Sequence, residues 1–319
     1  MTAHFADRAL AAIRVKNAPV CVGLDPLIDR LPDEILRTTG IESSPDGAVD
    51  GAVSSEAAAN AFIAFGRELI AIVAPRVPII KINIAFFERY HAEGVRAYHE
   101  LVREAGRAGM IVIGDVKRAD IGHTSLQYAV GSLTGDSAGV VVPPDAVTVN
   151  PYFGIDGVQP FIDIAKKRGR GLFVLVQTSN ASAASVQGLA LADGSTVGDH
   201  VAGLVQGWAA EEGLIGTSGY SCVGAVVSPR DLEATDRVRR LMPHCLFLVP
   251  GFGAQGRTPD EVAHCFKPDG TGAIVAASRS VIFAHREAKH RDAFGDDWRR
   301  CIAHACGEVV REIRTVLGR

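Results

Sequence analysis

The sequence predicts an α/β protein, a (β/α)8 TIM barrel that forms a single domain over residues 1–319. Eight short apolar runs recur along the chain, and a segment of helical character follows each one. Most of the runs are continuously apolar, as in parallel strands buried on both faces. A doubly wound open sheet would need fewer strands and a Gly-x-Gly-x-x-Gly turn after the first, and the sequence has neither. The predicted strands are 19–25, 77–83, 110–117, 146–151, 171–178, 222–228, 245–251 and 272–278.

The segments between the runs carry helix signals. Ser228 precedes Pro229, which predicts a capping serine and a proline in the first helical turn. Thr258 with Glu261 three residues later predicts a capping box. A closing helix is predicted over 296–317. From Glu56 on, one apolar helical stripe is predicted, made of Ala59, Phe62, Phe65, Leu69, Ile70 and Val73.

Additions to the barrel are expected at three places. The polar, amphipathic start of the chain predicts an extra N-terminal helix and has no long apolar block of the secretory kind. The stretches 27–55 and 180–198 are long, rich in small and polar residues, and follow the carboxyl ends of predicted strands. Barrel enzymes place their site loops at those ends. The alternative for 38–55 is a surface insertion without a role in the site.

Composition excludes several classes of protein. Hydrophobic residues make up 47% and charged residues 22% of the chain, which is ordinary for a globular fold with a large core. The net charge of −3 gives no basic field for nucleic acid or an anionic membrane. No apolar run reaches the roughly 18 residues of a membrane span. Six cysteines without a Cys-x-x-Cys pair favour a reduced, cytoplasmic protein over a disulfide framework.

Polar side chains interrupt the ends of the first three apolar runs. Asp25 ends the first, Lys81 and Asn83 end the second, and Asp115 and Lys117 end the third. Because strand side chains alternate between faces, Asp115 and Lys117 share one face, roughly 6–7 Å apart along the strand. A lone charge at a strand end is usually a solvated terminus. Charges on three successive strands are better explained by a mutually paired network at the barrel mouth.

The strongest single segment is Asp-Val-Lys-Arg-Ala-Asp at 115–120, where a strand turns into a loop. Two carboxylates, Asp115 and Asp120, around Lys117 favour its protonated form. An oriented ammonium is suited to donating a proton or stabilising an anion. Schiff-base chemistry needs a neutral amine instead, so we favour proton donation.

Glycine-rich and basic segments follow the seventh and eighth runs, the usual phosphate site of this fold. They are Val-Pro-Gly-Phe-Gly-Ala-Gln-Gly at 249–256 and Ala-Ser-Arg-Ser at 277–280. Glycines allow backbone N–H groups to approach an anion, and Arg279 can bind phosphate with two hydrogen bonds. Gln177 to Asn180 end the fifth run. Their amides and hydroxyls suit the polar edge of a ring, and helix capping explains them nearly as well.

The sequence predicts no metal site and no cofactor. The ten histidines show no metal-ligand spacing, and His264, Cys301, His304 and Cys306 are interpreted as helix-face residues. No nucleophile elbow, Walker loop or nicotinamide fingerprint is present.

Together these motifs resemble the orotidine 5′-phosphate decarboxylase family. The matching segments are Gly-Leu-Asp at 23–25, Lys-Ile-Asn at 81–83, 115–120 followed by Thr124, 250–256 and 278–280, within residues 21–283. The forms GLDP, KINIAFFE and DVKRADIGHT resemble its longer bacterial subgroup, often called type 2. Ser278 departs from the pattern, because many relatives have glycine before the arginine.

The resemblance implies cofactor-free decarboxylation of orotidine 5′-phosphate to uridine 5′-phosphate in pyrimidine synthesis, by a homodimer with shared sites. It implies that Lys117 is the proton donor and that Lys81, Asp115 and Asp120 complete the charged array, with Asp120 reaching the partner's site. The implied substrate-binding residues are Asp25 and Lys81 for the ribose, Thr124 for the ribose across the interface, Ser179 for the pyrimidine, and Gln255, Arg279, Gly253 and Ser278 for the phosphate.

Two other functions fit the same fold. One is a metal-dependent sugar-phosphate decarboxylase or aldolase, which would need an acidic metal ligand where this chain has Lys81, and a cation there repels Mg²⁺. The other is a non-catalytic nucleotide-binding barrel, which would keep the phosphate loops without needing the charged array.

Overall fold

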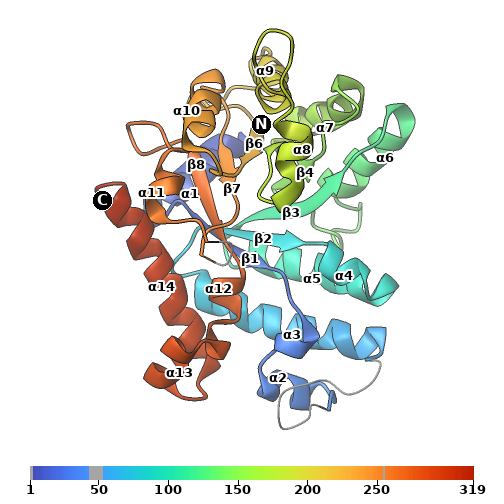
Figure 1. Ribbon diagram of the computed structural model, residues 1–319. Coiled ribbons are helices and arrows are strands. Elements are labelled where there is room, and N and C mark those ends of the chain that lie inside the picture. The colour runs from blue at the N-terminus through green and yellow to red at the C-terminus, as the bar shows by residue number, and fades with distance from the viewer. Residues whose placement is uncertain (1–2, 43–52, 254–255) are drawn as a thin grey trace.

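Eight parallel strands close into a barrel in the computed structural model, which describes residues 3–42, 53–253 and 256–319 (Figure 1). Each strand pairs with its neighbours in the chain, and β1 closes the ring against β8. The predicted (β/α)8 fold is confirmed. The strands are β1 Val20–Leu24, β2 Ile79–Asn83, β3 Ile111–Arg118, β4 Ala146–Val149, β5 Gly171–Gln177, β6 Val223–Val227, β7 Phe247–Val249 and β8 Ala273–Ala277.

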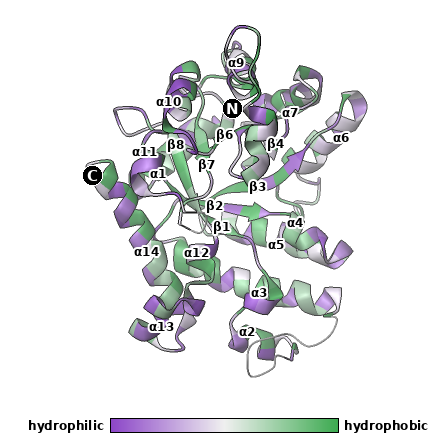
Figure 2. Ribbon diagram, in the orientation of Figure 1, coloured by the Kyte–Doolittle hydropathy of each residue, from purple (hydrophilic) through white to green (hydrophobic). Residues whose placement is uncertain are grey.

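Helices surround the barrel, with their apolar faces toward the strands and their polar faces outward (Figure 2). Almost every strand residue is buried, as the continuous apolar runs predict. No helix within the described residues combines the length and apolarity that crossing a membrane requires. The α-helices are α1 Phe5–Lys16, α2 Asp33–Thr38, α3 Ser55–Val73, α4 Ala85–Glu88, α5 His91–Arg107, α6 Gly122–Leu133, α7 Ile155–Arg168, α8 Ala184–Gln187, α9 Val197–Ala209, α10 Leu232–Leu241, α11 Pro259–Ala263, α12 Arg279–Ile282, α13 Ala288–Phe294 and α14 Trp298–Val316.

The local helix signals have mixed outcomes. All six residues of the predicted apolar stripe of α3 are buried, and the capping box of Thr258 and Glu261 starts α11. The predicted cap at Ser228 is wrong, because Asp231 caps α10 instead. The backbone N–H of Ser228 donates to the carbonyl of Gln177 at 2.8 Å, so this residue extends the β5–β6 pairing. Its buried hydroxyl has no partner within the described residues.

The additions to the barrel lie where the sequence places them. The extra N-terminal helix, α1, precedes β1, and its Phe5 ring meets Phe173 of β5 edge-to-face at 5.9 Å. A Cβ atom on Gly171 would come within 2.2 Å of Phe5, so glycine is required there. The stretch 27–55 contains the 3-10 helix Ile28–Arg30 and α2, and residues 43–52 of it lie outside the described residues.

The helix α14 is hydrogen-bonded to the end of α1. The guanidinium of Arg314, in α14, donates to the carbonyl oxygens of Lys16 and Asn17 at the end of α1, at 2.8 and 2.7 Å. The helix α14 also packs against α3 and β1. Residues about 300 positions apart therefore meet beside the β1–β8 seam.

The β1–β8 seam depends on a tight contact between Gly23 and Ser278. A Cβ on Gly23 would lie 1.8 Å from Ser278 Oγ and 2.7 Å from its Cβ. We expect Gly23→Ala to cost about 1–3 kcal/mol of unfolding free energy through overpacking, measured by urea denaturation. Adding Ser278→Gly removes both clashing atoms, so the double variant should recover most of the loss.

Gly106 provides the matched control, because it lies in α5 and a Cβ there meets nothing within 4 Å. Gly106→Ala should stabilise the chain by up to about 1 kcal/mol through helix propensity. Equal effects of alanine at both glycines, or additive effects of Gly23→Ala and Ser278→Gly, would contradict the steric account.

Candidate active site

A cavity opens at the carboxyl ends of the strands, and all eight strand ends contribute to its wall. Strands β1 to β4 supply charged and polar side chains, whereas β5 to β8 supply hydroxyls, apolar side chains and one arginine. The charged half is formed by Asp25, Lys81, Asn83, Asp115, Lys117 and Thr148. The other half is formed by Leu175, Thr178, Ser179, Val226, Leu248, Pro250, Gly251, Phe252, Ala276, Ser278 and Arg279.

Lys81 lies between two carboxylates at the base of the charged half. Its Nζ donates to Asp25 Oδ1 at 3.3 Å and to Asp115 Oδ2 at 2.9 Å. The parallel register places Lys81 between Gly23 of β1 and Ile113 of β3, so the acids that follow on those strands flank it. All three side chains are largely buried, and such charges are tolerated only when they are paired.

Asp115 is shared by both lysines. Lys117 Nζ donates to Asp115 Oδ1 at 2.5 Å, and the hydroxyl of Thr148 donates to the same oxygen at 2.8 Å. Both oxygens of a carboxylate that is only 8% exposed are thus bonded, while the Lys117 side chain remains 50% exposed to the cavity side. Lys117 is therefore an anchored ammonium that a ligand can still reach.

The backbone at Lys117 departs from regular strand geometry. Its φ is +43°, in the left-handed region that disfavours side chains, and the β3–β4 register shifts between Gly114 and Arg118. The hydroxyl of Thr148 accepts the backbone N–H of Lys117 at 2.9 Å and holds the bulge in place. Strain of this kind persists where surrounding contacts fix it, often at functional sites.

The charges of the cluster stabilise one another. Burial raises the pKa of Asp115, but the adjacent Lys81 and Lys117 outweigh it and hold that pKa well below its usual range. Burial likewise opposes the charge of Lys81, yet Asp25 and Asp115 raise its pKa above the ordinary lysine value. Asp115 and Lys81 therefore stay ionised at neutral pH.

Hydroxyl and amide groups form the opposite rim. The backbone N–H of Thr178 donates to Gln187 Oε1 at 3.0 Å, and Gln187 Nε2 donates to the Thr178 hydroxyl at 2.7 Å. That hydroxyl donates to Asn180 Oδ1 at 2.6 Å. The first two hydrogen bonds connect Thr178 to Gln187 of α8. Thr178 and its neighbour Ser179 both line the cavity.

Arg279 and a glycine-rich turn form the remaining wall. Gly251 lines the cavity with φ +97°, and Arg279 follows β8 directly beside Ser278. Gly253 (φ +70°) does not line the cavity, and its N–H donates to the carbonyl of Arg257 at 3.3 Å. Gln255 lies outside the described residues.

Asp120 and Thr124 do not line the cavity of their own chain. The Asp120 Oδ1 atom accepts the N–H of Ile121 at 2.8 Å, and Thr124 is exposed on α6. The expectation that two acids of one chain flank Lys117 is therefore wrong for the described residues, since only Asp115 contacts it. Lys81 is the lysine that has two flanking carboxylates.

Sequence reasoning missed Thr148 and Gln187. Thr148 reads as an ordinary β-branched residue of a buried strand, and its partners lie 31 and 33 positions away. Its burial within an otherwise apolar strand is the signal that would have identified it, because a buried hydroxyl needs a partner. Gln187 lies in a polar loop and offers no such signal.

Comparison with known proteins gives a consistent result. The model of the orotidine 5′-phosphate decarboxylase / HUMPS family matches residues 19–291. An orotidine 5′-phosphate decarboxylase of Rhodopirellula baltica is 36% identical over 314 residues, covering 97% of this chain and 99% of that protein. One from Caldicellulosiruptor saccharolyticus is 32% identical, covering 91% and 92%. The solved OMP decarboxylase of Leishmania donovani superposes with a TM-score of 0.71 at 27% identity, covering 99% of each chain.

The chain belongs to the orotidine 5′-phosphate decarboxylase / HUMPS family. The resemblance inferred from the motifs is thereby confirmed. In this member of the orotidine 5′-phosphate decarboxylase / HUMPS family, segments 23–25, 81–83, 115–117 and 278–279 all reach one cavity although they are spread over more than 250 positions.

Acid should destabilise this family member partly through Asp115. A carboxyl whose folded pKa is depressed contributes stability that is fully present above its unfolded pKa, about 4, and is lost as the pH falls toward the folded value. We expect the unfolding free energy, measured by urea denaturation, to fall more steeply below about pH 4.5 in the unmodified chain than in Asp115→Asn. The difference in slope can reach about 1.4 kcal/mol per pH unit.

Asp163→Asn on the exposed side of α7 is the control, and it should keep the slope of the unmodified chain. Parallel curves for Asp115→Asn and the unmodified chain would show that the cluster does not depress the Asp115 pKa.

Proposed function

We propose that this chain is an orotidine 5′-phosphate decarboxylase, a carboxy-lyase that converts orotidine 5′-phosphate to uridine 5′-phosphate and CO2 in pyrimidine synthesis, without a cofactor. The observation that carries the proposal is the paired array of Lys81, Asp115 and Lys117 in the cavity. The relatives named above as orotidine 5′-phosphate decarboxylases support the substrate.

The reaction requires a charge to be stabilised. When the bond between C6 and the carboxylate breaks, the electron pair stays on C6, in the plane of the ring, where no carbonyl delocalises it. The Lys117 ammonium then stabilises this carbanion and transfers a proton from Nζ to C6, after which water reprotonates the amine. Fixed charges that need no rearrangement are the most effective stabilisers of such a state.

Asp115 serves the reaction by holding Lys117. The 2.5 Å bond restricts the ammonium to one region of the cavity, and Lys81 and Thr148 in turn fix the carboxylate. The carboxylate of Asp115 also lies on the cavity wall, where a substrate carboxylate near it would be repelled.

The rest of the cavity suits the remaining parts of the nucleotide. Asp25 and Lys81 are proposed to bind the ribose and Ser179 the pyrimidine, against the apolar floor of Leu175, Val226 and Leu248. Arg279 is proposed to bind the phosphate, with Ser278, Gly253 and Gln255. Binding energy from this remote group can be used to align the reacting carbon.

Lys81 also disfavours a metal-dependent reaction at this place. Its Nζ lies 3.3 and 2.9 Å from the two carboxylates that would otherwise coordinate an ion. A divalent cation would have to displace a buried, doubly paired ammonium.

We further propose that the active form is a homodimer. Exposed apolar side chains gather on the β3–α6 loop, on α6 and on the turn before α7. The helices α6 and α7 pack against each other. Tyr152 is 82% exposed although its ring meets Phe153 edge-to-face. Exposed apolar side chains gathered on neighbouring segments are typical of an interface. The residues are Ile121, Leu126, Tyr128, Val130, Tyr152 and Phe153.

Asp120 and Thr124, predicted site residues that do not line their own cavity, lie beside Ile121 and Leu126 of this set in the chain. A dimer formed through this set would carry them toward the partner's cavity. We also propose one domain over residues 1–319, supported by the large apolar core that α1, the strands and α14 share. The six free, buried cysteines suit a reducing, cytoplasmic location.

Lys117→Ala should lower kcat by about 10²–10⁴-fold or more, because it removes both the proton donor and the charge. The assay follows the loss of orotidine 5′-phosphate absorbance, and circular dichroism checks the fold. Lys167→Ala, an exposed lysine of α7, is the control and should retain full activity. A rate within about tenfold of the unmodified enzyme would reject the assigned role, since that is only about 1.4 kcal/mol.

Shared sites predict complementation between inactive variants. Lys117→Ala and Asp120→Ala should each be nearly inactive as homodimers. Their co-expressed mixture should recover up to about a quarter of normal activity, because half of the dimers are mixed and each has one intact site. No recovery on mixing would show that Asp120 does not act in the partner's cavity.

A further inference from the structure

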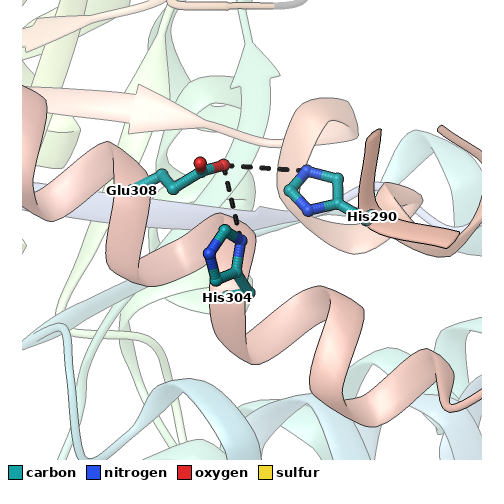
Figure 3. A group of neighbouring side chains, drawn as sticks. All are labelled: His290, His304 and Glu308. Carbon is teal, nitrogen blue, oxygen red and sulfur yellow. Dashed lines mark ion pairs between the residues drawn. The ribbon is translucent and has the colours of Figure 1, made fainter. Parts of the chain in front are cut away.

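Three potential metal ligands converge on the C-terminal helices, and none of them lines the active-site cavity. His290 lies on α13, and His304 and Glu308 lie one turn apart on α14 (Figure 3). Glu308 Oε2 is 3.8 Å from His290 Nε2 and 3.7 Å from His304 Nδ1. The three ligand atoms all lie within 4.8 Å of one another.

The two imidazoles lack ordinary partners. The side chain of His290 is 3% exposed, and within the described residues its Nδ1 makes no hydrogen bond. His304 Nδ1 is also buried without a hydrogen-bond partner in that part of the chain, although it faces Glu308. The carboxylate at 3.7–3.8 Å is too far for a hydrogen bond to either ring. His290 faces Glu308 through its other nitrogen, Nε2, which also lies 3.8 Å from Glu287 Oε2. A buried ring nitrogen without a hydrogen bond, as in both imidazoles, requires an explanation.

The spacing of these atoms suits a small ion at their centre. Around a tetrahedral ion with ligand bonds of about 2.0–2.2 Å, the donor atoms lie roughly 3.3–3.6 Å apart. The two histidine–glutamate distances exceed this range by only a few tenths of an ångström. Side-chain rotation of the partly exposed His304 and Glu308 can close the remaining separation.

We propose that His290, His304 and Glu308 bind a divalent transition-metal ion with the coordination chemistry of Zn²⁺, which cross-links α13 to α14. Two imidazoles and one carboxylate form a ligand set that zinc accepts, with a fourth position left for water. These residues do not line the active-site cavity, so the role is structural. A satellite apolar cluster of Ala284, Cys301 and Ala305, with Phe294 packed against it, lies between the same helices.

Lys289 is paired with the carboxylate that would bind the ion, and its Nζ donates to Glu308 Oε2, the proposed ligand atom, at 2.8 Å. Its Nζ lies 2.7 Å from Glu308 Oε1, and its side chain is 62% exposed. A bound ion would compete with this ammonium for the carboxylate, and the flexible lysine can swing into solvent. The competition gives the proposal a specific signature, because removing Lys289 should strengthen metal binding.

The test is a titration of the metal-free full-length chain with Zn²⁺ by calorimetry, and with Co²⁺ by visible absorption, which reports tetrahedral coordination. One ion per chain is expected, with a dissociation constant in the micromolar range or below. At a hundredfold excess over that constant the melting temperature should rise by about 2–4 °C.

Variants assign the ligands. His304→Ala and Glu308→Gln should weaken Zn²⁺ binding by at least about tenfold and abolish the thermal shift. Lys289→Met should tighten it severalfold. His264→Ala is the matched control, because His264 is as exposed as His304 and also faces a carboxylate, that of Asp236 at 2.8 Å, and it should bind Zn²⁺ as the unmodified chain does.

Decarboxylation should remain unchanged in all four variants. Absence of saturable binding would overturn the proposal. So would one bound ion that persists in both His304→Ala and Glu308→Gln, or a Lys289→Met affinity lower than that of the unmodified chain.

Discussion

The bonding of Asp115 is the constraint on which the site depends. Its two oxygens accept from Lys81, Lys117 and Thr148, which come from β2, β3 and β4. An unpaired carboxylate at that depth would be costly, and so would either lysine without it. The cluster is therefore stable only when three adjacent strands are in register. Conversely, correct register places an anchored ammonium in the cavity without any loop having to supply it.

The barrel architecture could be predicted from the sequence because buried parallel strands have a simple sequence pattern. Continuous apolar runs followed by helical segments fix the number and order of strands, and alternation along a strand places Asp115 and Lys117 on one face. These statements use only local information. The same reasoning placed Asp25, Lys81 and Arg279 at the mouth because each lies near or just beyond the carboxyl end of its strand.

What the sequence did not reveal depends on contacts between distant residues. The left-handed backbone at Lys117 is accompanied by a hydrogen bond to Thr148 on the next strand, and no local pattern encodes this contact. Ser228 has the sequence context of a helix cap, yet its backbone N–H donates to the carbonyl of Gln177 in β5. Asp231 caps α10 instead. His290 is 14 and 18 positions from His304 and Glu308, and only the crossing of two helices brings them together. The pairing of polar side chains at the strand ends therefore depends on tertiary structure.

The hydrogen bonds from Arg314 to the end of α1 have a consequence for biosynthesis. The ribosome releases β1 early, but its neighbour β8 and the arginine that secures α1 emerge about 250 and 300 residues later. Until then the nascent barrel is an open sheet with two unpaired edges, and the wall that carries Arg279 is missing. Contacts this distant in sequence form late and slowly. A chain interrupted before β8 would thus expose apolar strand faces and unpaired edges to chaperones and proteases, whereas one interrupted before α14 would have all eight strands but not the contact that secures α1.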